Sequence, residues 1–279
     1  MAATAVEEVT GRPPRSVEQF AGGWGAVPFW ATAADGTRLV VRVGHEERPY
    51  TQEAATLACV RAAGIPAPEV AGVCRVEGRP VSVLVRVDGA PLSDVGQGPD
   101  REERCFEAGR WLARVHDVDA GGLDLVPAPS LDRTLATADA LVRTLPATDA
   151  RVIADAVAQL DVLRAPVVPA LCHADFGSDH VLTDGDQVTA IIDWEWASFG
   201  DPARDLGWWL VHFEDPRRGA PAVREGYGPP DAALDARVRA WMFAICIEAV
   251  QFRLGQGDPT GTAATLRRIA HLFDERTFG

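Results

Sequence analysis

The chain of 279 residues contains no lysine and no asparagine, so all 27 of its basic residues are arginine. Its 40 acidic residues outnumber them and leave a formal net charge of -13. Because proteins that bind nucleic acid normally present a positive surface to the phosphates, this balance argues against a nucleic-acid partner. A negative protein suits a cationic small molecule, although acidity also simply keeps a protein soluble.

Long apolar runs are also missing, since no stretch approaches the roughly 18 to 20 residues needed to cross a bilayer. The first residues, MAATAVEEVTGRPPRS, lack the basic start and apolar run of a secretion signal, so we expect a cytoplasmic protein with no membrane partner. Five scattered cysteines without CxxC spacing predict reduced thiols. The length permits one large domain or two lobes, and the sequence leaves monomer and homodimer open.

The first part of the chain has the pattern of a small β-rich lobe. Two apolar segments flank Asp35-Gly36, a pair that favours a hairpin turn, and two more flank Glu77-Gly78. Between these pairs, Thr51 is a candidate N-cap for a helix that Gly64 would end. We therefore expect about five strands and one helix between Ser16 and Val87.

After Asp88-Gly89 the apolar periodicity becomes helical. The segments with this pattern are 101–118, 131–145, 148–163, 231–254 and 262–273. They predict a larger, mainly α second lobe. The expected fold class is therefore α+β, with residues 1–88 as a nucleotide-binding lobe and residues 89–279 as a catalytic and substrate-binding lobe.

One β-like segment interrupts the helical pattern and reads HADFGSDHVLTDGDQVTAIIDWEWASFGDPARD over residues 173–205. Asp175 lies two residues after His173, where a carboxylate can orient a substrate hydroxyl and accept its proton. Asp193 follows a turn at Asp184-Gly185 and an apolar strand, and a carboxylate there suits Mg²⁺. Loop, strand, turn, strand and acid in this order are typical of phosphoryl-transfer sites in kinase-like folds.

Other polar residues of this segment have structural interpretations. His173 can act as a general base, but we expect it mainly to hold the loop through hydrogen bonds. Asp201 and Asp205 in GDPARDL are typical of acids that cap a helix or tether a loop.

On these residues the segment resembles the aminoglycoside phosphotransferase family of small-molecule kinases, and it is most similar to hygromycin B 4-phosphotransferases. The resemblance implies a protein-kinase-like, two-lobed fold, with Asp175 as catalytic base and Asp193 as a ligand of Mg²⁺. It also implies an ATP- or GTP-dependent O-phosphotransferase acting on a cationic or polyhydroxyl substrate, and hence an antibiotic-resistance kinase. A metabolic kinase for a choline-like, sugar or amino-alcohol substrate, a macrolide kinase and an inactive binding protein are alternatives.

His180 departs from the pattern, because most of the family has asparagine at this position. Macrolide phosphotransferases resemble this chain in having histidine there. Neutral imidazole offers one nitrogen lone pair and suits softer metals better than Mg²⁺. We therefore hypothesise that His180 is a metal ligand that weakens Mg²⁺ binding or allows Mn²⁺.

The kinase pattern also requires a cation on the third strand and an acid on the following helix. Without lysine, Arg42 is the candidate cation and Glu53 its partner, since arginine can engage two phosphate oxygens. A surface ion pair of small effect is the alternative. Other candidates for nucleotide binding are a glycine loop over the phosphates and a hinge that meets the purine: Gly22, Gly23 and Gly25, then Val85 and Val87.

Acidic and aromatic residues near the site segment are candidates for substrate contacts. They are Asp179, Glu195, Trp196 and Glu214. Acidic side chains favour a polycationic aminoglycoside, whereas aromatic rings stack on a sugar or drug ring and favour a macrolide. Taken singly, each acid is more often an ordinary solvated residue, and Trp208 and Trp209 are more often core.

Overall fold

The computed structural model describes residues 1–21, 26–45, 50–212 and 216–273. The chain forms two compact units. Unit 1 consists of Met1–Val95, Val118–Leu125 and Asp179–Ala197, and unit 2 of Gly96–Asp117, Val126–Ser178 and the described part of Ser198–Gly279. Within the described ranges, no helix is both long enough and apolar enough to span a bilayer.

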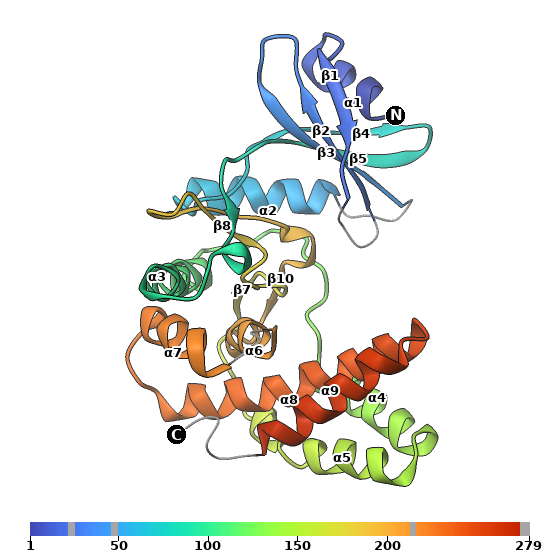
Figure 1. Ribbon diagram of the computed structural model, residues 1–279, viewed down its shortest axis with the longest axis vertical. Coiled ribbons are helices and arrows are strands. Elements are labelled where there is room, and N and C mark those ends of the chain that lie inside the picture. Colours follow the sequence, from blue (N-terminus) through green and yellow to red (C-terminus); the bar gives the residue numbers. More distant parts are fainter. Residues whose placement is uncertain (22–25, 46–49, 213–215, 274–279) are drawn as a thin grey trace. The chain divides into compact units, whose positions relative to one another are not determined.

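A five-stranded antiparallel sheet lies at the centre of unit 1, with the strand order β1-β2-β3-β5-β4 (Figure 1). Its strands are β1 (Ser16–Gln19), β2 (Ala26–Thr32), β3 (Arg38–Gly44), β4 (Val70–Val76) and β5 (Arg79–Val85). Helix α1 (Ala2–Thr10) precedes the sheet, and α2 (Tyr50–Ala62) lies between β3 and β4 in the chain. Both predicted hairpins are confirmed.

The alternation of side chains along β3 decides what each face of the sheet presents. Leu39, Val41 and Val43 are buried in one apolar cluster with residues of α1. Because successive side chains of a strand point to opposite faces, Arg42 points to the face away from α1. There it contacts Glu53 of α2, which is buried. The register of β3 thus places the Arg42 cation against α2.

Unit 1 also contains a three-stranded sheet with the order β6-β8-β9. Its strands are β6 (Ala90–Pro91), β8 (Val181–Thr183) and β9 (Val188–Ile191). The predicted turn between β8 and β9 is present, and Asp184 Oδ1 accepts the backbone N–H groups of Asp186 and Gln187 at 3.0 Å each. The boundary between the units is therefore not a single cut at residue 88. The β8–β9 hairpin comes much later in the chain, but it pairs with β6 and belongs to unit 1. The separate functions expected for residues 1–88 and 89–279 stay predictions.

Unit 2 is mainly helical in its described part. Its helices are α3 (Pro99–His116), α4 (Leu131–Thr144), α5 (Ala147–Val157), α6 (Ala203–His212), α7 (Pro216–Tyr227), α8 (Ala232–Gly255) and α9 (Pro259–Leu272). Helix α8 packs against α4, α6 and α9 (Figure 1). Its middle is almost wholly buried. Strands β7 (Ala170–Cys172) and β10 (Ser198–Gly200) pair antiparallel, and β7 leads directly into the loop that begins at His173.

Two local expectations need correction, and one helix is absent from the sequence prediction. The sequence pattern does not predict α1, because its buried stripe consists only of Ala2, Ala5 and Val6. Helix α2 already includes Tyr50, so Thr51 lies in its first turn and is not the N-cap. The helix expected over 148–163 ends at Val157 and is followed by a short 3-10 helix. Each error concerns a short helix or a helix end, where apolar periodicity is weakest.

Helices α3 and α7 approach each other closely at two glycines. A Cβ atom at Gly109 would lie 2.1 Å from the carbonyl oxygen of Val223. A Cβ atom at Gly226 would lie 1.9 Å from the carbonyl oxygen of Phe106. Both distances are far inside van der Waals contact, and both neighbours are backbone atoms that no side-chain rotation can move.

We expect Gly109→Ala to lower the free energy of unfolding by about 2–3 kcal/mol, because α7 must shift to accept the methyl group. Gly255→Ala is the matched control, since that helix-end position has nothing within 4 Å. Denaturant titration of both variants measures the difference. Equal stability of the two variants would contradict the close backbone packing of α3 and α7.

Candidate active site

Arg42 joins two carboxylates in unit 1. Its Nη1 donates to Asp193 Oδ1 at 2.9 Å, and its Nη2 donates to Glu53 Oε2. The side chains of Arg42 and Glu53 are 14% and 1% exposed, whereas that of Asp193 is 32% exposed. A guanidinium presents its donors in a rigid planar fork, so one side chain holds both acids at once.

The Arg42 cluster, which consists of Arg42, Glu53, Asp193 and Glu195, contains more negative than positive charge. Burial raises the pKa of Glu53 to about 7, while Arg42 opposes the rise and Asp193 and Glu195 add to it. Burial alone would lower the pKa of Arg42, but Glu53 and Asp193 raise it above its usual value. The guanidinium is therefore permanently charged, and it interacts with the three carboxylates of the cluster. Such a cluster can accept a divalent cation.

The β8–β9 hairpin brings His180 and Asp193 together. His180 directly precedes β8, Asp193 follows β9 by two residues, and Ile192 N–H donates to the carbonyl oxygen of His180 at 2.9 Å. His180 Nε2 lies 3.7 Å from Asp193 Oδ2. Two ligands at about 2.1 Å from one ion stand roughly 3.0–3.4 Å apart. A small side-chain rotation would therefore let one ion meet both residues, and their metal-binding role stays a prediction.

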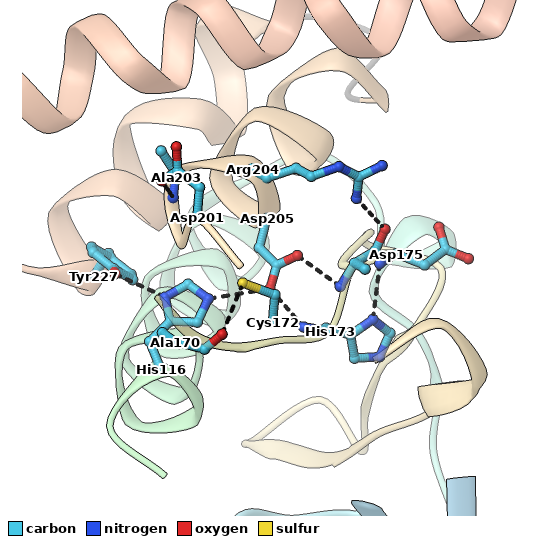
Figure 2. Close-up of polar contacts among 11 residues, drawn as sticks. His116, Ala170, Cys172, His173, Asp175, Asp201, Ala203, Arg204, Asp205 and Tyr227 are labelled. Carbon is cyan, nitrogen blue, oxygen red and sulfur yellow. Dashed lines mark hydrogen bonds and ion pairs between the residues drawn. The ribbon is translucent and has the colours of Figure 1, made fainter. Parts of the chain in front are cut away.

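A buried carboxylate in unit 2 holds the loop that carries Asp175 (Figure 2). Asp205 of α6 accepts the N–H of His173 at 2.7 Å and the N–H of Ala174 at 2.8 Å. Asp175 follows, and its own N–H donates to His173 Nδ1 at 3.3 Å. Asp205 is fully buried. The interpretation of Asp205 as a loop tether is confirmed by these bonds, and His173 supports the same loop from within.

Ala174 adopts a backbone conformation that few residues other than glycine adopt, with φ of 67°. Such left-handed residues cost roughly 1–3 kcal/mol and persist where their surroundings fix them. Here Asp205 accepts the N–H of Ala174, and Arg204 Nη1 donates to its carbonyl oxygen at 2.8 Å. Both polar groups of this residue are thus held, which fixes the direction in which the chain enters Asp175.

Helices α3 and α7 support Asp205 in turn. His116 Nε2 lies 3.1 Å from Asp205 Oδ2, and His116 Nδ1 lies 2.8 Å from the hydroxyl oxygen of Tyr227 (Figure 2). Burial alone would raise the pKa of Asp205, but His116 and the N–H of His173 bring it below its usual value. The sequence pattern identifies His116 only as a helix end and does not identify Tyr227 or Arg204. Arg204 adjoins Asp205 in GDPARDL, which is the one available signal.

Asp201 caps α6 and also ties it to α8. Its Oδ1 accepts the N–H of Ala203 at 3.0 Å. Its Oδ2 accepts hydrogen bonds from Arg237 Nη2 and Trp241 Nε1, each at 2.6 Å. The expected capping role of Asp201 is therefore confirmed, and the helix that carries Asp205 is fixed at its first turn.

The predicted nucleotide contacts are only partly described. Gly22, Gly23 and Gly25 lie outside the described residues. Val85 N–H donates to the carbonyl oxygen of Glu69 at 2.8 Å, so this donor is engaged within unit 1. Val87 lies two residues beyond the end of β5. These nucleotide-binding roles stay predictions.

The predicted substrate residues differ in their exposure. Asp179 is exposed, and Trp196 is 50% exposed, as a group that meets a substrate must be. Glu195 is instead buried, and its negative charge raises the pKa of Arg42. Glu214 lies outside the described residues. Trp209 is core as expected, since it is buried against Phe176. Substrate roles for the four candidates stay predictions.

Residues 16–241 match the model of the phosphotransferase enzyme family. The chain belongs to this family. Hygromycin-B 4-O-kinase from Escherichia coli is 36% identical over 99 residues, which cover 33% of this chain and 28% of that protein. The chain thus matches less than a third of the length of this curated relative.

Solved structures share the fold along nearly the whole chain. A thermostable mutant of aminoglycoside phosphotransferase APH(4)-Ia, in complex with ADP and hygromycin B, has a TM-score of 0.77 at 22% identity, over 99% of this chain and 98% of that one. The GDP complex of aminoglycoside 2'-phosphotransferase-IIIa has a TM-score of 0.77 at 16% identity, over 98% of each chain. The predicted α+β fold class and the predicted family are both confirmed.

We expect Asp205→Asn to lower the free energy of unfolding by about 3 kcal/mol, because the amide NH₂ would face backbone N–H donors in a buried site. The pKa of Asp205 is lowered by folding, so its carboxylate stabilises the fold above about pH 4 and this contribution is lost as the pH falls further. Thermal melts between about pH 3 and pH 7 should show a smaller pH dependence for the variant.

The exposed turn residue Asp186 offers a matched control, and Asp186→Asn should melt as the wild type does. A melting temperature of Asp205→Asn equal to that of the wild type at pH 7 would contradict the tether.

Proposed function

We propose that this protein is a kinase that transfers the γ-phosphate of ATP or GTP to a hydroxyl group of an aminoglycoside-like antibiotic. The bridge from Glu53 through Arg42 to Asp193 carries this proposal, because it sets a candidate phosphate-binding cation beside a candidate metal-binding carboxylate. Membership of the phosphotransferase enzyme family supports the reaction type. Relatives solved with ADP and hygromycin B, or with GDP, support the nucleotide and substrate class.

Asp193 and His180 would hold the metal ion. A carboxylate oxygen and an imidazole nitrogen form a donor set that fits Mg²⁺ and suits Mn²⁺ better. When bound, a divalent cation supplies positive charge to the phosphate oxygens. Asp193 therefore needs a fixed orientation, and Arg42 gives it one through Oδ1.

Arg42 would bind the phosphates, with Glu53 as its anchor. Glu53 is almost wholly buried, so the ion pair holds the guanidinium in one place. The guanidinium adds a permanent positive charge where charge spreads over the transferred phosphoryl oxygens. Because the guanidinium is already held in place before nucleotide binds, binding costs less conformational entropy.

Asp175 would act on the acceptor hydroxyl. The hydroxyl oxygen forms a bond to the γ-phosphorus while the bond from that phosphorus to the bridging β-phosphate oxygen breaks, which releases the nucleoside diphosphate. The hydroxyl proton passes to the Asp175 carboxylate. The loop bonds from Asp205 and Arg204 keep the backbone at Asp175 fixed during this step.

Charge favours an aminoglycoside among the candidate acceptors. The net charge of -13 attracts a polycation and speeds its encounter with the protein. Asp179 is exposed within the site segment and can pair with an ammonium group of the substrate. Trp196, exposed in the same segment, can stack on a sugar ring.

Purified protein incubated with ATP or GTP, Mg²⁺ or Mn²⁺, and a panel of acceptors tests this function. We expect mass spectrometry to show a gain of one phosphate on an aminoglycoside. Asp175→Asn should reduce turnover by roughly 10²–10⁴-fold with nucleotide binding retained, because proton acceptance is lost. Asp186→Asn, in an exposed turn, is the control and should keep its activity.

Other results of the same panel would contradict the proposal. Phosphorylation of only a choline-like, sugar or amino-alcohol acceptor would identify a metabolic kinase instead. Absence of thermal stabilisation by every nucleotide and metal combination would identify a binding protein that lacks kinase activity. Near-normal turnover by Asp175→Asn would remove this residue from its assigned role.

We expect His180→Asn to shift metal preference toward Mg²⁺, because an amide oxygen is a harder ligand than an imidazole nitrogen. The ratio of turnover with Mg²⁺ to turnover with Mn²⁺ should rise by roughly tenfold. Steady-state assays with each metal measure this ratio in the variant and in the wild type. An unchanged ratio would show that His180 does not bind the metal.

A further inference from the structure

The two oxygens of Asp193 face different partners. Oδ1 accepts a hydrogen bond from Arg42 Nη1 at 2.9 Å. Oδ2 lies 3.7 Å from His180 Nε2, which is slightly longer than the separation of two ligands of one ion. One oxygen is therefore occupied by protein, and the other faces the second candidate ligand.

Several features of unit 1 keep Arg42 in this position. It lies on β3, the central strand of the five-stranded sheet, between Pro28 of β2 and Ser82 of β5. Its other terminal nitrogen is held by Glu53, and its guanidinium carbon lies 5.0 Å from the centre of the Tyr50 ring. A side chain this restricted can impose an orientation on Asp193, whose side chain is 32% exposed.

We propose that Arg42 limits Asp193 to one-oxygen coordination and thereby selects small divalent cations, Mg²⁺ and Mn²⁺, against Ca²⁺. This inference rests on the proposed function, because it takes the pair His180 and Asp193 as the metal ligands. It assigns Arg42 a positioning role in addition to its contact with phosphates. The residue acts on the metal only through the orientation of Asp193.

The coordination chemistry of the two ion classes supports this selection. Mg²⁺ demands near-octahedral geometry at about 2.0–2.1 Å, in which one carboxylate oxygen fills one position and water fills several others. Ca²⁺ accepts six to eight oxygens at roughly 2.3–2.6 Å and commonly takes both oxygens of one carboxylate. With Oδ1 held by Arg42, the two-oxygen mode is disfavoured, and Ca²⁺ loses a ligand that Mg²⁺ does not need.

The chemistry of arginine explains why this device requires Arg42 itself. The guanidinium fork donates to Glu53 and Asp193 through two separate nitrogens in one plane. A lysine ammonium is a compact charge on a flexible stem and does not fix both carboxylates in this geometry. Arg42→Lys therefore keeps the positive charge but releases Oδ1. The variant thus distinguishes an effect of Asp193 orientation from repulsion of the metal ion by a positive charge.

The test is binding of Mn²⁺ alone, followed by electron paramagnetic resonance, with Ca²⁺ and Mg²⁺ as competitors. For Arg42→Lys we expect the affinity for Ca²⁺ relative to Mg²⁺ to rise by roughly tenfold, the size typical when a partner of a metal ligand is removed. Arg38→Lys is the matched control, because Arg38 lies on the same strand in an exposed ion pair with Asp88. Its preference should equal that of the wild type.

The other outcomes overturn the inference, and they distinguish its failure from the failure of the proposed function. If the wild type binds Mn²⁺ and Arg42→Lys keeps the wild-type ratio, this inference fails and the proposed function stands. If the wild type binds no Mn²⁺ with or without nucleotide, both fail. Should Arg42→Lys not fold, Arg42→Met, of similar length and without donors, also releases Oδ1 and must show the same rise.

Discussion

The need to compensate buried negative charge governs both units of this protein. A carboxylate taken out of water must be paired or hydrogen-bonded, since an isolated buried charge is prohibitively unfavourable. Glu53 meets this need through Arg42, and Asp205 meets it through two backbone N–H groups and His116. In each case the compensating group also positions a residue of the candidate active site. Stability and site geometry therefore depend on the same bonds.

The two compensating arrangements differ in what they hold. In unit 1 a side-chain cation ties a helix acid to Asp193, so the fixed object is a side chain. In unit 2 a side-chain acid ties backbone groups, so the fixed object is the loop before Asp175. A metal ligand needs its donor atom to point in a defined direction. A general base needs a defined position beside the hydroxyl group that loses its proton. The two kinds of restraint match these two needs.

The sequence predicts much of this because periodicity and turn chemistry are local signals. The alternation in β3 and the Asp-Gly turns lead directly to the sheet, and the spacing within 173–205 leads to Asp175 and Asp193. Tyr227 and Arg204 are not predicted in their roles, because they reach the loop through packing of α3, α6 and α7. The sequence also does not predict that His180 lies beside Asp193 and hence beside the Arg42 cluster, because this contact depends on the register of β8 and β9.

The absence of lysine and asparagine gives the site its particular chemistry. A chain that uses arginine on β3 gains a fork that reaches a second carboxylate, and a chain that uses histidine at position 180 replaces an oxygen donor with a nitrogen. The first change fixes one oxygen of Asp193, and the second softens the donor set. In the proposed function both changes would act on the same ion, so the chemistry of each depends on the other. A metal preference set by this pair would follow from the composition of the chain as much as from its fold.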